Sequence, residues 1–335
     1  MHRKKVRIHF ILATCLLLLL MLNTQIAAVG AQDGVKLCIQ VIIPSLFPFF
    51  FLTGYLIPML TNISFPGFRW LCNKLNIPSG REGLLILGLI GGYPVGAQAI
   101  NCAFHDGKLQ KAQAHRLMGF CSNAGPAFIF GVTGALFPSP AVPWILWAIH
   151  IISALLTGVI LPKVQHAHAG STDSAEITML QALRKSLTVT ASVCGWVILF
   201  KVALSILFHI LRLQDSFTKV ILSGFFELSG GCIALNEISS LPLRFLLISA
   251  LLSFGGICVF MQTASVTAEC GTGLYLHGKL IQVLVSTMLS LTLVLLRDVH
   301  SFPFGAIISI YLIGTIGITV LRKVCRKKLW KLYCA

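Results

Sequence analysis

The chain has 335 residues, of which 56% are apolar and only 11% are charged. A soluble domain carries about a quarter charged residues because its surface must be solvated, so a water-soluble globule of this size is excluded. The outer surface must face lipid instead, where backbone polar groups have to be satisfied within helices. We therefore predict an all-α, polytopic membrane protein, in which residues 1–335 form a single transmembrane domain.

Apolar stretches long enough to cross a bilayer recur from Ile8 to Leu321. The first follows a basic start and contains a leucine run, so a cleaved signal peptide is the alternative to an uncleaved span. The stretch from Ile8 to Gly30 is long for a signal peptide, which favours the span. In chain order we predict about eight spans, near residues 8–29, 37–60, 118–137, 142–162, 186–211, 242–262, 279–297 and 303–321.

Two further apolar stretches, residues 84–104 and 219–236, each carry a glycine-rich break at mid-length. We predict that each folds back on itself as a re-entrant or broken hairpin. With the N-terminus inside, the inner segments hold 19 of the 26 Lys and Arg residues and the outer segments hold 5. This distribution follows the positive-inside rule and predicts a multi-pass protein of the cell membrane with both termini in the cytoplasm. The net charge of +16 therefore reflects topology, and no nucleic-acid partner is expected.

Two parts of the chain share one order of segments: a span, a broken segment, a span with a small-residue break, and a further span. The first enters from outside by the predicted topology and the second from inside, so we predict two inverted repeats. Transporters are often built in this way, with discontinuous helices that meet near the bilayer midplane. The predicted divisions are an N-terminal span (1–34), a first repeat (35–162), a cytoplasmic linker (163–182), a second repeat (183–300) and a last span with a basic tail (301–335).

The clearest break lies between residues 91 and 98. Gly91 and Gly92 weaken a helix, and Pro94 removes a hydrogen-bond donor and clashes with the preceding turn. In a membrane, freed backbone groups are tolerated only inside protein or against a water-filled cavity. We predict that the exposed amides, with Gln98 just beyond them, form part of a solute-binding site. Close packing of helices through small residues is the alternative.

The same device recurs at residues 122–126. Asn123 offers both a donor and an acceptor, and it precedes Gly125 and Pro126, which interrupt the helix. We predict that these three residues belong to the same site. The alternative is that Asn123 only satisfies a local backbone carbonyl.

The second half places an ionisable residue beside a glycine pair. Glu227 is followed by Gly230 and Gly231, and Gly255 marks the next break. An ionisable residue at membrane depth is a functional candidate by default, so we assign these four residues to the site. If the segment is re-entrant, Glu227 could instead lie near the outer interface and be hydrated.

Lys201 lies in the middle of the predicted span 186–211 and needs a partner there. Two partners are equally open, namely Glu227 in a structural ion pair and an anionic solute that binds at the site. The polar residues between Gln262 and Glu269 either line a path through the protein or form a cytoplasmic loop.

Enzymatic and metal-binding signatures are absent from the sequence. No GxSxG, HExxH or P-loop pattern occurs, and the eleven cysteines are scattered without a CxxC pair. We expect no catalytic residue, no metal site and no cofactor. The basic tail that begins at Arg322 is expected to contact anionic lipids of the inner leaflet, and faces of small residues permit a homo-oligomer.

Three motifs carry a resemblance to a known family. Residues 42–50 (IIPSLFPFF), 89–97 (LIGGYPVGA) and 121–128 (CSNAGPAF) are similar to the sporulation integral membrane protein family, of the nucleoside-recognition or Gate group of membrane domains. The resemblance implies a permease-like protein of endospore-forming bacteria, distantly like concentrative nucleoside transporters. It further implies spore maturation, including movement of dipicolinate, and a place in the outer forespore membrane. The second half lacks the polar density expected for binding a ribose, which favours a small anionic solute. A nucleoside-type transporter and a non-transporting scaffold of a sporulation complex are the alternatives.

Overall fold

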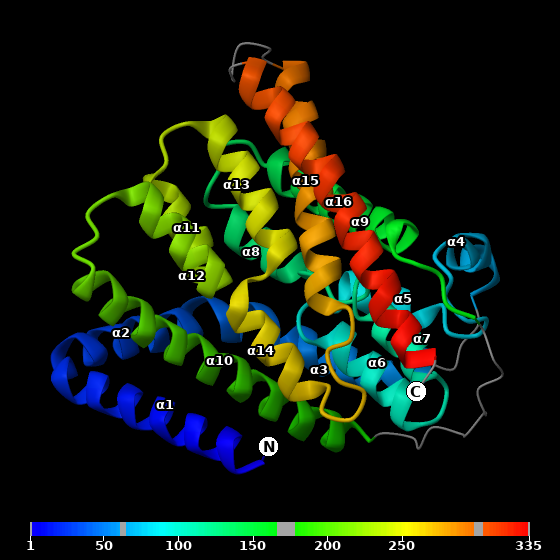
Figure 1. The fold of residues 1–335 in the computed structure, drawn as a ribbon, viewed down its shortest axis with the longest axis horizontal. Helices are drawn as coiled ribbons and strands as arrows, with labels where there is room; N and C mark the ends of the chain where they lie inside the picture. Colours follow the sequence, from blue (N-terminus) through cyan, green and yellow to red (C-terminus); the bar gives the residue numbers. More distant parts are fainter. Residues whose placement is uncertain (1, 61–64, 166–177, 298–303, 334–335) are drawn as a thin grey trace.

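The computed structural model describes residues 2–60, 65–165, 178–297 and 304–333, and every regular element in these ranges is a helix. Figure 1 shows them gathered around the discontinuous helices at the centre, with α1, α2 and α10 along one side and α16 along another. The predicted all-α polytopic fold is confirmed. Residues 166–177, most of the predicted linker 163–182, lie outside the described ranges.

The elements divide between the two predicted halves. Those before the linker are α1 (His2–Leu22), α2 (Thr24–Leu37), the π-helical turn η1 (Cys38–Ile42), α3 (Ile43–Leu60), η2 (Pro66–Phe68), α4 (Arg69–Lys74), α5 (Gly83–Ile90), α6 (Val95–His105), α7 (Lys111–Leu117), α8 (Pro126–Thr133) and α9 (Ala141–Ile160). Those after it are α10 (Met179–Ile210), α11 (Ser216–Phe226), α12 (Leu228–Ala234), η3 (Leu235–Glu237), α13 (Leu241–Phe254), α14 (Gly256–Val266), α15 (Tyr275–Arg297) and α16 (Phe304–Tyr333).

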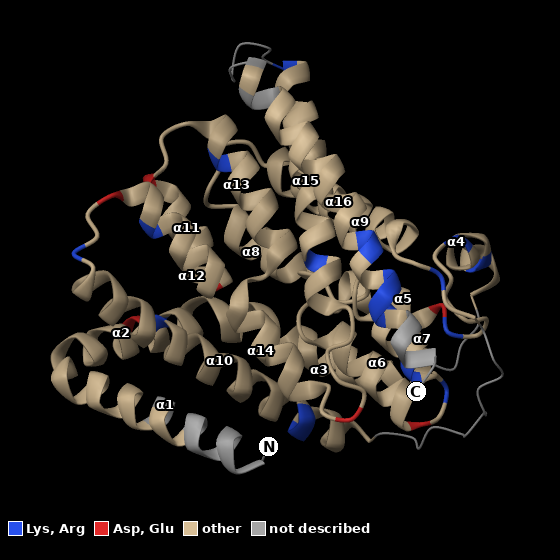
Figure 2. Ribbon diagram, viewed as in Figure 1, with Lys and Arg blue, Asp and Glu red and all other residues tan. Residues whose placement is uncertain are grey.

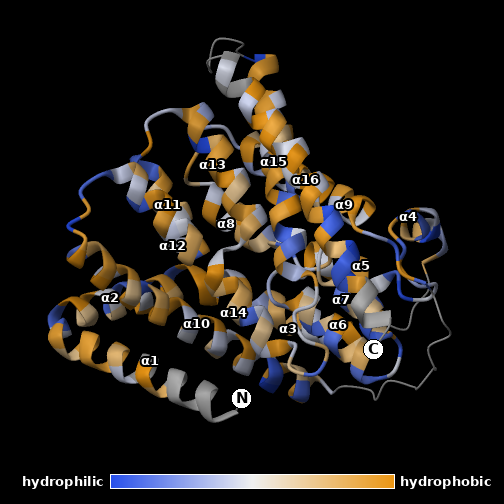
Figure 3. Cartoon of the chain, in the orientation of Figure 1, coloured by the Kyte–Doolittle hydropathy of each residue, from blue (hydrophilic) through white to orange (hydrophobic). Residues whose placement is uncertain are grey.

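Within the described residues, six helices or helix pairs are long and apolar enough to cross a bilayer. Their outer surfaces carry large apolar side chains that are mostly exposed, such as Leu199, Leu296 and Ile313. Figures 2 and 3 show that charged residues lie mainly at helix ends and in loops, whereas the helices themselves are predominantly hydrophobic. So much exposed apolar surface is unfavourable in water and fits a lipid-facing surface. The number of about eight spans stays a prediction. The six are Thr24–Leu60, Ala141–Ile160, Met179–Ile210, Leu241–Val266, Tyr275–Arg297 and Ile308–Leu329.

The predicted spans 8–29 and 37–60 have wrong boundaries. Helix α1 ends at Leu22, and Thr24–Leu60 forms one helical segment of 37 residues that contains η1. The interruption falls at Asn23 because its side-chain amide donates to the carbonyl of Leu19, and such a local bond competes with helical continuation. The predicted division between residues 34 and 35 therefore lies inside a continuous helix.

Both glycine-broken segments fold back on themselves, as predicted. In the first hairpin, α5 and α6 pack so closely that a Cβ added to Gly96 would lie 3.0 Å from the Cα of Gly88. In the second, formed by α11 and α12, a Cβ added to Gly231 would lie 2.2 Å from the Cα of Gly224. No helix in either hairpin exceeds 11 residues, whereas a membrane-spanning helix needs about 20.

The predicted span 118–137 is interrupted, as the predicted break at residues 122–126 requires. Helix α7 ends at Leu117, and helix α8 begins only at Pro126 after an irregular stretch. Asn123 stabilises this stretch by donating to the carbonyl of Phe120 at 2.7 Å, and Gly125 is extended with φ −78° and ψ 160°. Pro126 then occupies the first position of α8, where its missing N–H is no disadvantage.

Contacts between distant segments define two opposite faces. On the first, which we call the Arg116 face, the Arg116 guanidinium donates to the carbonyls of Leu75 and Pro162. On the second, the Arg244 face, the guanidinium of Arg244 donates to the carbonyl of Leu136. Segments that the charge rule places inside thus gather on the Arg116 face. That this face is cytoplasmic stays a prediction.

Corresponding elements of the two halves run in opposite directions between these faces. Helices α7 and α8 lead from the Arg116 face to the Arg244 face, whereas α13 and α14 lead back to the 267–274 loop, where His115 contacts the Cys270 carbonyl. Helix α9 ends beside Arg116 and α15 begins there, because the Leu274 N–H donates to the His115 carbonyl. This arrangement is the one expected of inverted repeats.

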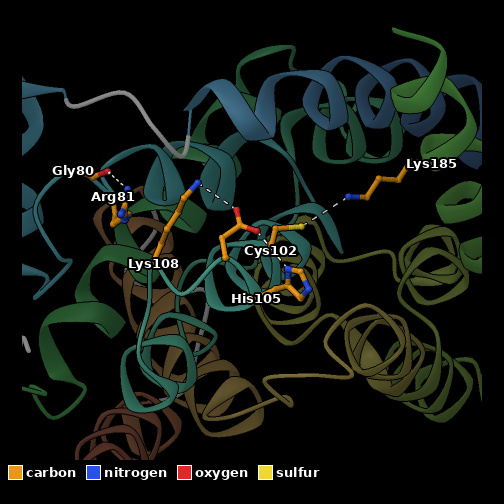
Figure 4. A network of polar contacts seen from close by, with 7 residues as sticks. Gly80, Arg81, Cys102, His105, Lys108 and Lys185 are labelled. Carbon is orange, nitrogen blue, oxygen red and sulfur yellow. Dashed lines mark hydrogen bonds and ion pairs between the residues drawn. The ribbon is translucent and has the colours of Figure 1, made fainter. Parts of the chain in front are cut away.

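The end of α6 and the loop after it carry a polar network (Figure 4). Asp106 lies 3.3 Å from Lys108 Nζ and 3.4 Å from His105 Nδ1. Lys185 of α10 contributes a contact of 3.8 Å from its Nζ to the sulfur of Cys102 in α6. The network therefore ties the first hairpin to the start of the second half.

A glycine contact in the core gives the first testable prediction. Gly278 of α15 packs on the α7–α8 break, and a Cβ there would lie 1.9 Å from the Gly119 carbonyl oxygen. We expect Gly278→Ala to lower the free energy of unfolding by about 2–3 kcal/mol, because backbone atoms must move to make room. Thermal unfolding of the purified protein in detergent measures this change. Gly195→Ala in α10 is the control, because nothing lies within 4 Å of the added atom. Equal stability of the two variants would contradict the packing.

Candidate functional site

Both hairpin tips, the α7–α8 break and helix α14, which follows the α13–α14 break, meet at one cavity of about 40 Å³. Its wall also includes residues of the continuous helices α3 and α10 and of the turn η1. Three predicted site residues line it, namely Gly92, Gly125 and Glu227. The other lining residues are Ile42, Leu46, Tyr93, Ala124, Phe128, Val193, Val197, Leu228, Ser229, Val259 and Gln262. The sequence therefore predicted the segments that converge here better than the individual side chains.

The first hairpin tip lies against the α7–α8 break. Gly92 has φ +77°, a conformation that favours glycine, and a Cβ on Gly125 would lie 2.9 Å from the Gly92 Cα. Tyr93, which was not predicted, spans the two halves, because its hydroxyl donates to the Leu252 carbonyl at 3.4 Å. Three predicted residues belong to this hairpin but lie outside the cavity wall: Gly91, Pro94 and Gln98.

Asn123 lies behind the cavity wall, immediately before the lining residues Ala124 and Gly125. Its side-chain Nδ2 donates to the carbonyls of Gly88 and Phe120, and its Oδ1 accepts from Lys279 Nζ at 3.0 Å. The alternative, that Asn123 only satisfies a local backbone carbonyl, thus describes part of the role of Asn123. Asn123 also connects the break to a buried cation. Pro126, the predicted residue two positions beyond Ala124, begins α8 outside the wall.

Lys279 lies in the second turn of α15, near the end of that helix on the Arg116 face, and it was not among the predicted site residues. Its side chain is fully buried, and its Nζ donates to Asn123 Oδ1 and, at 2.7 Å, to Gln282 Oε1. The Nζ also lies 5.1 Å from the centre of the Tyr93 ring and 5.7 Å from that of Tyr275. Nothing in the sequence indicates this burial, because Lys279 follows a polar loop and resembles a residue at a membrane boundary.

Glu227 forms the tip of the second hairpin and is buried, so the hydrated interfacial position is wrong. Its Oε1 accepts from the Ser229 N–H at 2.8 Å, and its Oε2 accepts from the Gly230 N–H at 2.6 Å. The carboxylate thereby caps α12 while it faces the cavity. Gly231, the next predicted residue, packs on α11 and lies outside the wall.

Lys201 of α10 lies beside this tip. A Cβ on Gly230 would be 2.6 Å from Lys201 Nζ and 2.9 Å from Glu227 Oε2, so both groups cover the same glycine. Among the described residues, the ion pairs within 4.0 Å involve Asp106 and do not include this pair. Lys201 is therefore a neighbour of Glu227 but does not form a direct ion pair with it. An anionic solute as the partner of Lys201 stays a prediction.

The α13–α14 break mirrors the first one. Gly255 and Gly256 have φ +81° and +80°, and a Cβ on Gly256 would lie 3.1 Å from the Gly224 carbonyl oxygen of the second hairpin. Gly255 lies outside the cavity wall but contacts the Tyr93 ring. Gln262 is buried in α14 and lines the cavity, which excludes a cytoplasmic loop at this position.

The turn η1 supplies a feature that the sequence did not reveal. It interrupts the helix Thr24–Leu60, and its last residue, Ile42, lines the cavity. Single π-helical turns inside α-helices occur frequently at functional sites. Apolar periodicity cannot show such a turn, because it adds one residue without changing composition.

The described residues contain no group of three His, Cys, Asp or Glu side chains that could hold a metal ion. The predicted lipid contact of the basic tail stays a prediction. In the described part of that tail, Lys328 Nζ donates to the Gly273 carbonyl at 2.8 Å, which attaches α16 to the loop on the Arg116 face.

These features define a class: a polytopic helical membrane protein with two hairpins and two discontinuous helices around one central cavity. The chain is 27% identical to the sporulation integral membrane protein YlbJ of Bacillus subtilis (strain 168), over 72% of this chain and 70% of that relative. No family model and no solved structure matches the chain. The predicted resemblance to the sporulation integral membrane protein family is thereby confirmed. Transport and a nucleoside-recognition domain stay predictions.

Proposed function

We propose that this protein moves a small anionic solute across a membrane during spore formation, by alternating access around the central cavity. The observation that supports this most is the convergence of both hairpin tips, the α7–α8 break and helix α14 on that cavity. Irregular backbone at membrane depth is tolerated where it is buried or lines a cavity, and transporter sites are commonly built from such helices. Similarity to a sporulation membrane protein supports the setting, and dipicolinate is the solute we favour.

The local chemistry supports an anionic solute. The cavity already holds one carboxylate, that of Glu227, which two backbone N–H groups bind and which Lys201 approaches from α10. Helices α6, α8 and α14 also begin at the tips and breaks, so their partly positive ends surround the same region. Catalysis and a cofactor have no part in the proposal.

The cavity in this structure is closed to such a solute. A volume of about 40 Å³ admits a few water molecules at most, whereas small-molecule pockets enclose roughly 300–1,000 Å³. Transport therefore requires the tips to move away from the breaks. The contacts that must separate join small residues, Gly92 to Gly125 and Gly256 to the second tip. Interfaces of this kind can separate with little change in side-chain packing.

Uptake of labelled dipicolinate into liposomes that contain the purified protein tests the proposal. We expect saturable uptake by the wild type and a loss of at least tenfold in Gly92→Leu, because the leucine fills the cavity. Gly107→Leu is a matched control. Gly107 also has a positive φ, +67°, but nothing lies within 4 Å of an added Cβ. Both variants therefore carry similar backbone strain, of the order of 1–2 kcal/mol, and only one blocks the site.

Absence of uptake by folded wild-type protein would overturn the transport proposal and favour the scaffold alternative. Uptake of uncharged nucleosides in place of the dicarboxylate would favour the nucleoside-type alternative. Equal loss in both glycine variants would show that strain, and not blockage of the cavity, causes the defect.

A further inference from the structure

Lys279 is a fully buried cation whose partners, within the described part of the chain, are neutral. Two amide oxygens accept from its Nζ, and the rings of Tyr93 and Tyr275 lie next to it. Burying a charge without an opposite charge is expensive, and such residues inside membrane proteins are commonly functional.

The hydrogen bonds around Asn123 fix which way its amide points. Its Nδ2 donates to two backbone carbonyls, those of Gly88 at 3.0 Å and Phe120 at 2.7 Å, so Oδ1 faces Lys279 as an acceptor. Lys279 must then be the donor. The aromatic ring next to Nζ on the cavity side, that of Tyr93, favours a cation electrostatically. The surroundings of Lys279 therefore offer two acceptors and an aromatic face that can stabilise an ammonium group.

The same partners separate Lys279 from the cavity. Tyr93 belongs to the cavity wall, and Asn123 immediately precedes the wall residues Ala124 and Gly125. One layer of side chains thus lies between the ammonium and the closed cavity. Tyr93 is part of the first hairpin tip and Asn123 part of the α7–α8 break, which are the elements that must separate when the cavity opens.

We propose that Lys279 determines the specificity of the cavity, by binding the carboxylate of an aromatic acid once the first hairpin tip moves away. This inference rests on the proposed transport of an anionic solute. In the closed protein Asn123 and Gln282 hold the ammonium, and in the open protein a carboxylate replaces the Asn123 oxygen. The Tyr93 ring beside the cation offers an aromatic solute a surface for stacking. Anion binding and separation of the tip from the break thus favour each other.

The test compares pyridine-2,6-dicarboxylate with its uncharged diamide, using binding and uptake together. Binding is measured as the rise in unfolding temperature of the detergent-solubilised protein with added ligand. We expect Lys279→Gln to weaken dicarboxylate binding about tenfold to a hundredfold, as the loss of a hydrogen bond to a charged group predicts. Weak binding of the diamide should stay unchanged. Lys279→Arg should retain part of the preference for the charged ligand.

Gln282→Met is the matched control, because it removes one partner of Lys279 and leaves the charge in place. It should keep the preference for the dicarboxylate. If Lys279→Gln weakens binding of both ligands equally, Lys279 is a structural residue and the inference is wrong. If the wild type binds the dicarboxylate through Lys279 without uptake, the transport proposal fails while the anion site stands. If the wild type shows neither binding nor uptake, both fail. If the Lys279→Gln variant retains both uptake and binding of the dicarboxylate, the inference about Lys279 is wrong and the transport proposal stands.

Discussion

Replacing Arg116 by methionine is expected to lower the free energy of unfolding by about 4 kcal/mol, because several buried carbonyls lose their partner together. Arg116 is 1% exposed, and its guanidinium donates to the carbonyls of Leu75, Gly158 and Pro162, with a longer bond to that of Leu161. These groups belong to the C-terminal ends of α4 and α9, where helical carbonyls lack partners. Arg116 therefore joins the loop before the first hairpin to the last helix of the first half.

The unfolding temperature of the detergent-solubilised protein should fall by roughly 10 °C in this variant. Arg116→Lys should recover little of the loss, because a single ammonium cannot reproduce the planar set of donors that reaches several carbonyls at once. Arg212→Met is the control for removal of a positive charge, because Arg212 is exposed at the end of α10. A similar fall in the Arg212 variant would attribute the effect to net charge and contradict the bonding described here.

The sequence predicts the two hairpins well because the residues at their breaks have known effects on the backbone. Gly92 adopts a positive φ, and Pro94 has no N–H to donate to the preceding turn. These local effects interrupt the helix whatever the neighbouring segments are. Pro126 and the preceding Gly125 likewise locate the start of α8. Such signals are local, and they position each break within a few residues.

The side chains of the site are less predictable because their roles depend on contacts between distant segments. Lys279 and Asn123 are 156 residues apart in sequence, and nothing near either one shows that they bond. Tyr93 was not predicted as a site residue, although it lines the cavity and its hydroxyl contacts the second half of the chain. The boundary at Asn23 was missed for a different reason, because a single side-chain bond within an apolar run produced it.

The two hairpins differ at their tips although their elements correspond. The second tip places a carboxylate, that of Glu227, on the N-terminal end of α12, whereas the first has Tyr93 beside Gly92. Positive charge reaches the two tips from different helices, from Lys201 of α10 and from Lys279 of α15. The asymmetry suggests that a solute carboxylate binds at the first tip, since the second is already occupied by the protein's own.

Glu227→Gln should accordingly lower the apparent KM for an anionic solute about tenfold and slow turnover. A glutamine side chain has an NH₂ group in place of one of the two oxygens, so in the wild-type geometry only one of the Ser229 and Gly230 N–H groups keeps its acceptor. One N–H and the nearby ammonium of Lys201 then become available to the solute, while a negative charge that repels it is removed. A gain of about 1.4 kcal/mol in binding corresponds to the tenfold change, and tighter binding delays release.

Asp215→Asn is the matched control for the loss of a capping carboxylate. Asp215 caps α11 of the same hairpin by accepting from the Thr218 N–H at 2.6 Å, but it lies outside the cavity. Each variant should lose some stability through its weakened cap. Only Glu227→Gln should change the concentration dependence of dipicolinate uptake. A raised or unchanged KM with reduced uptake would show that Glu227 acts only through the conformation of the tip. The anionic solute would then bind only on the side of the cavity wall that Tyr93 and Gly92 provide.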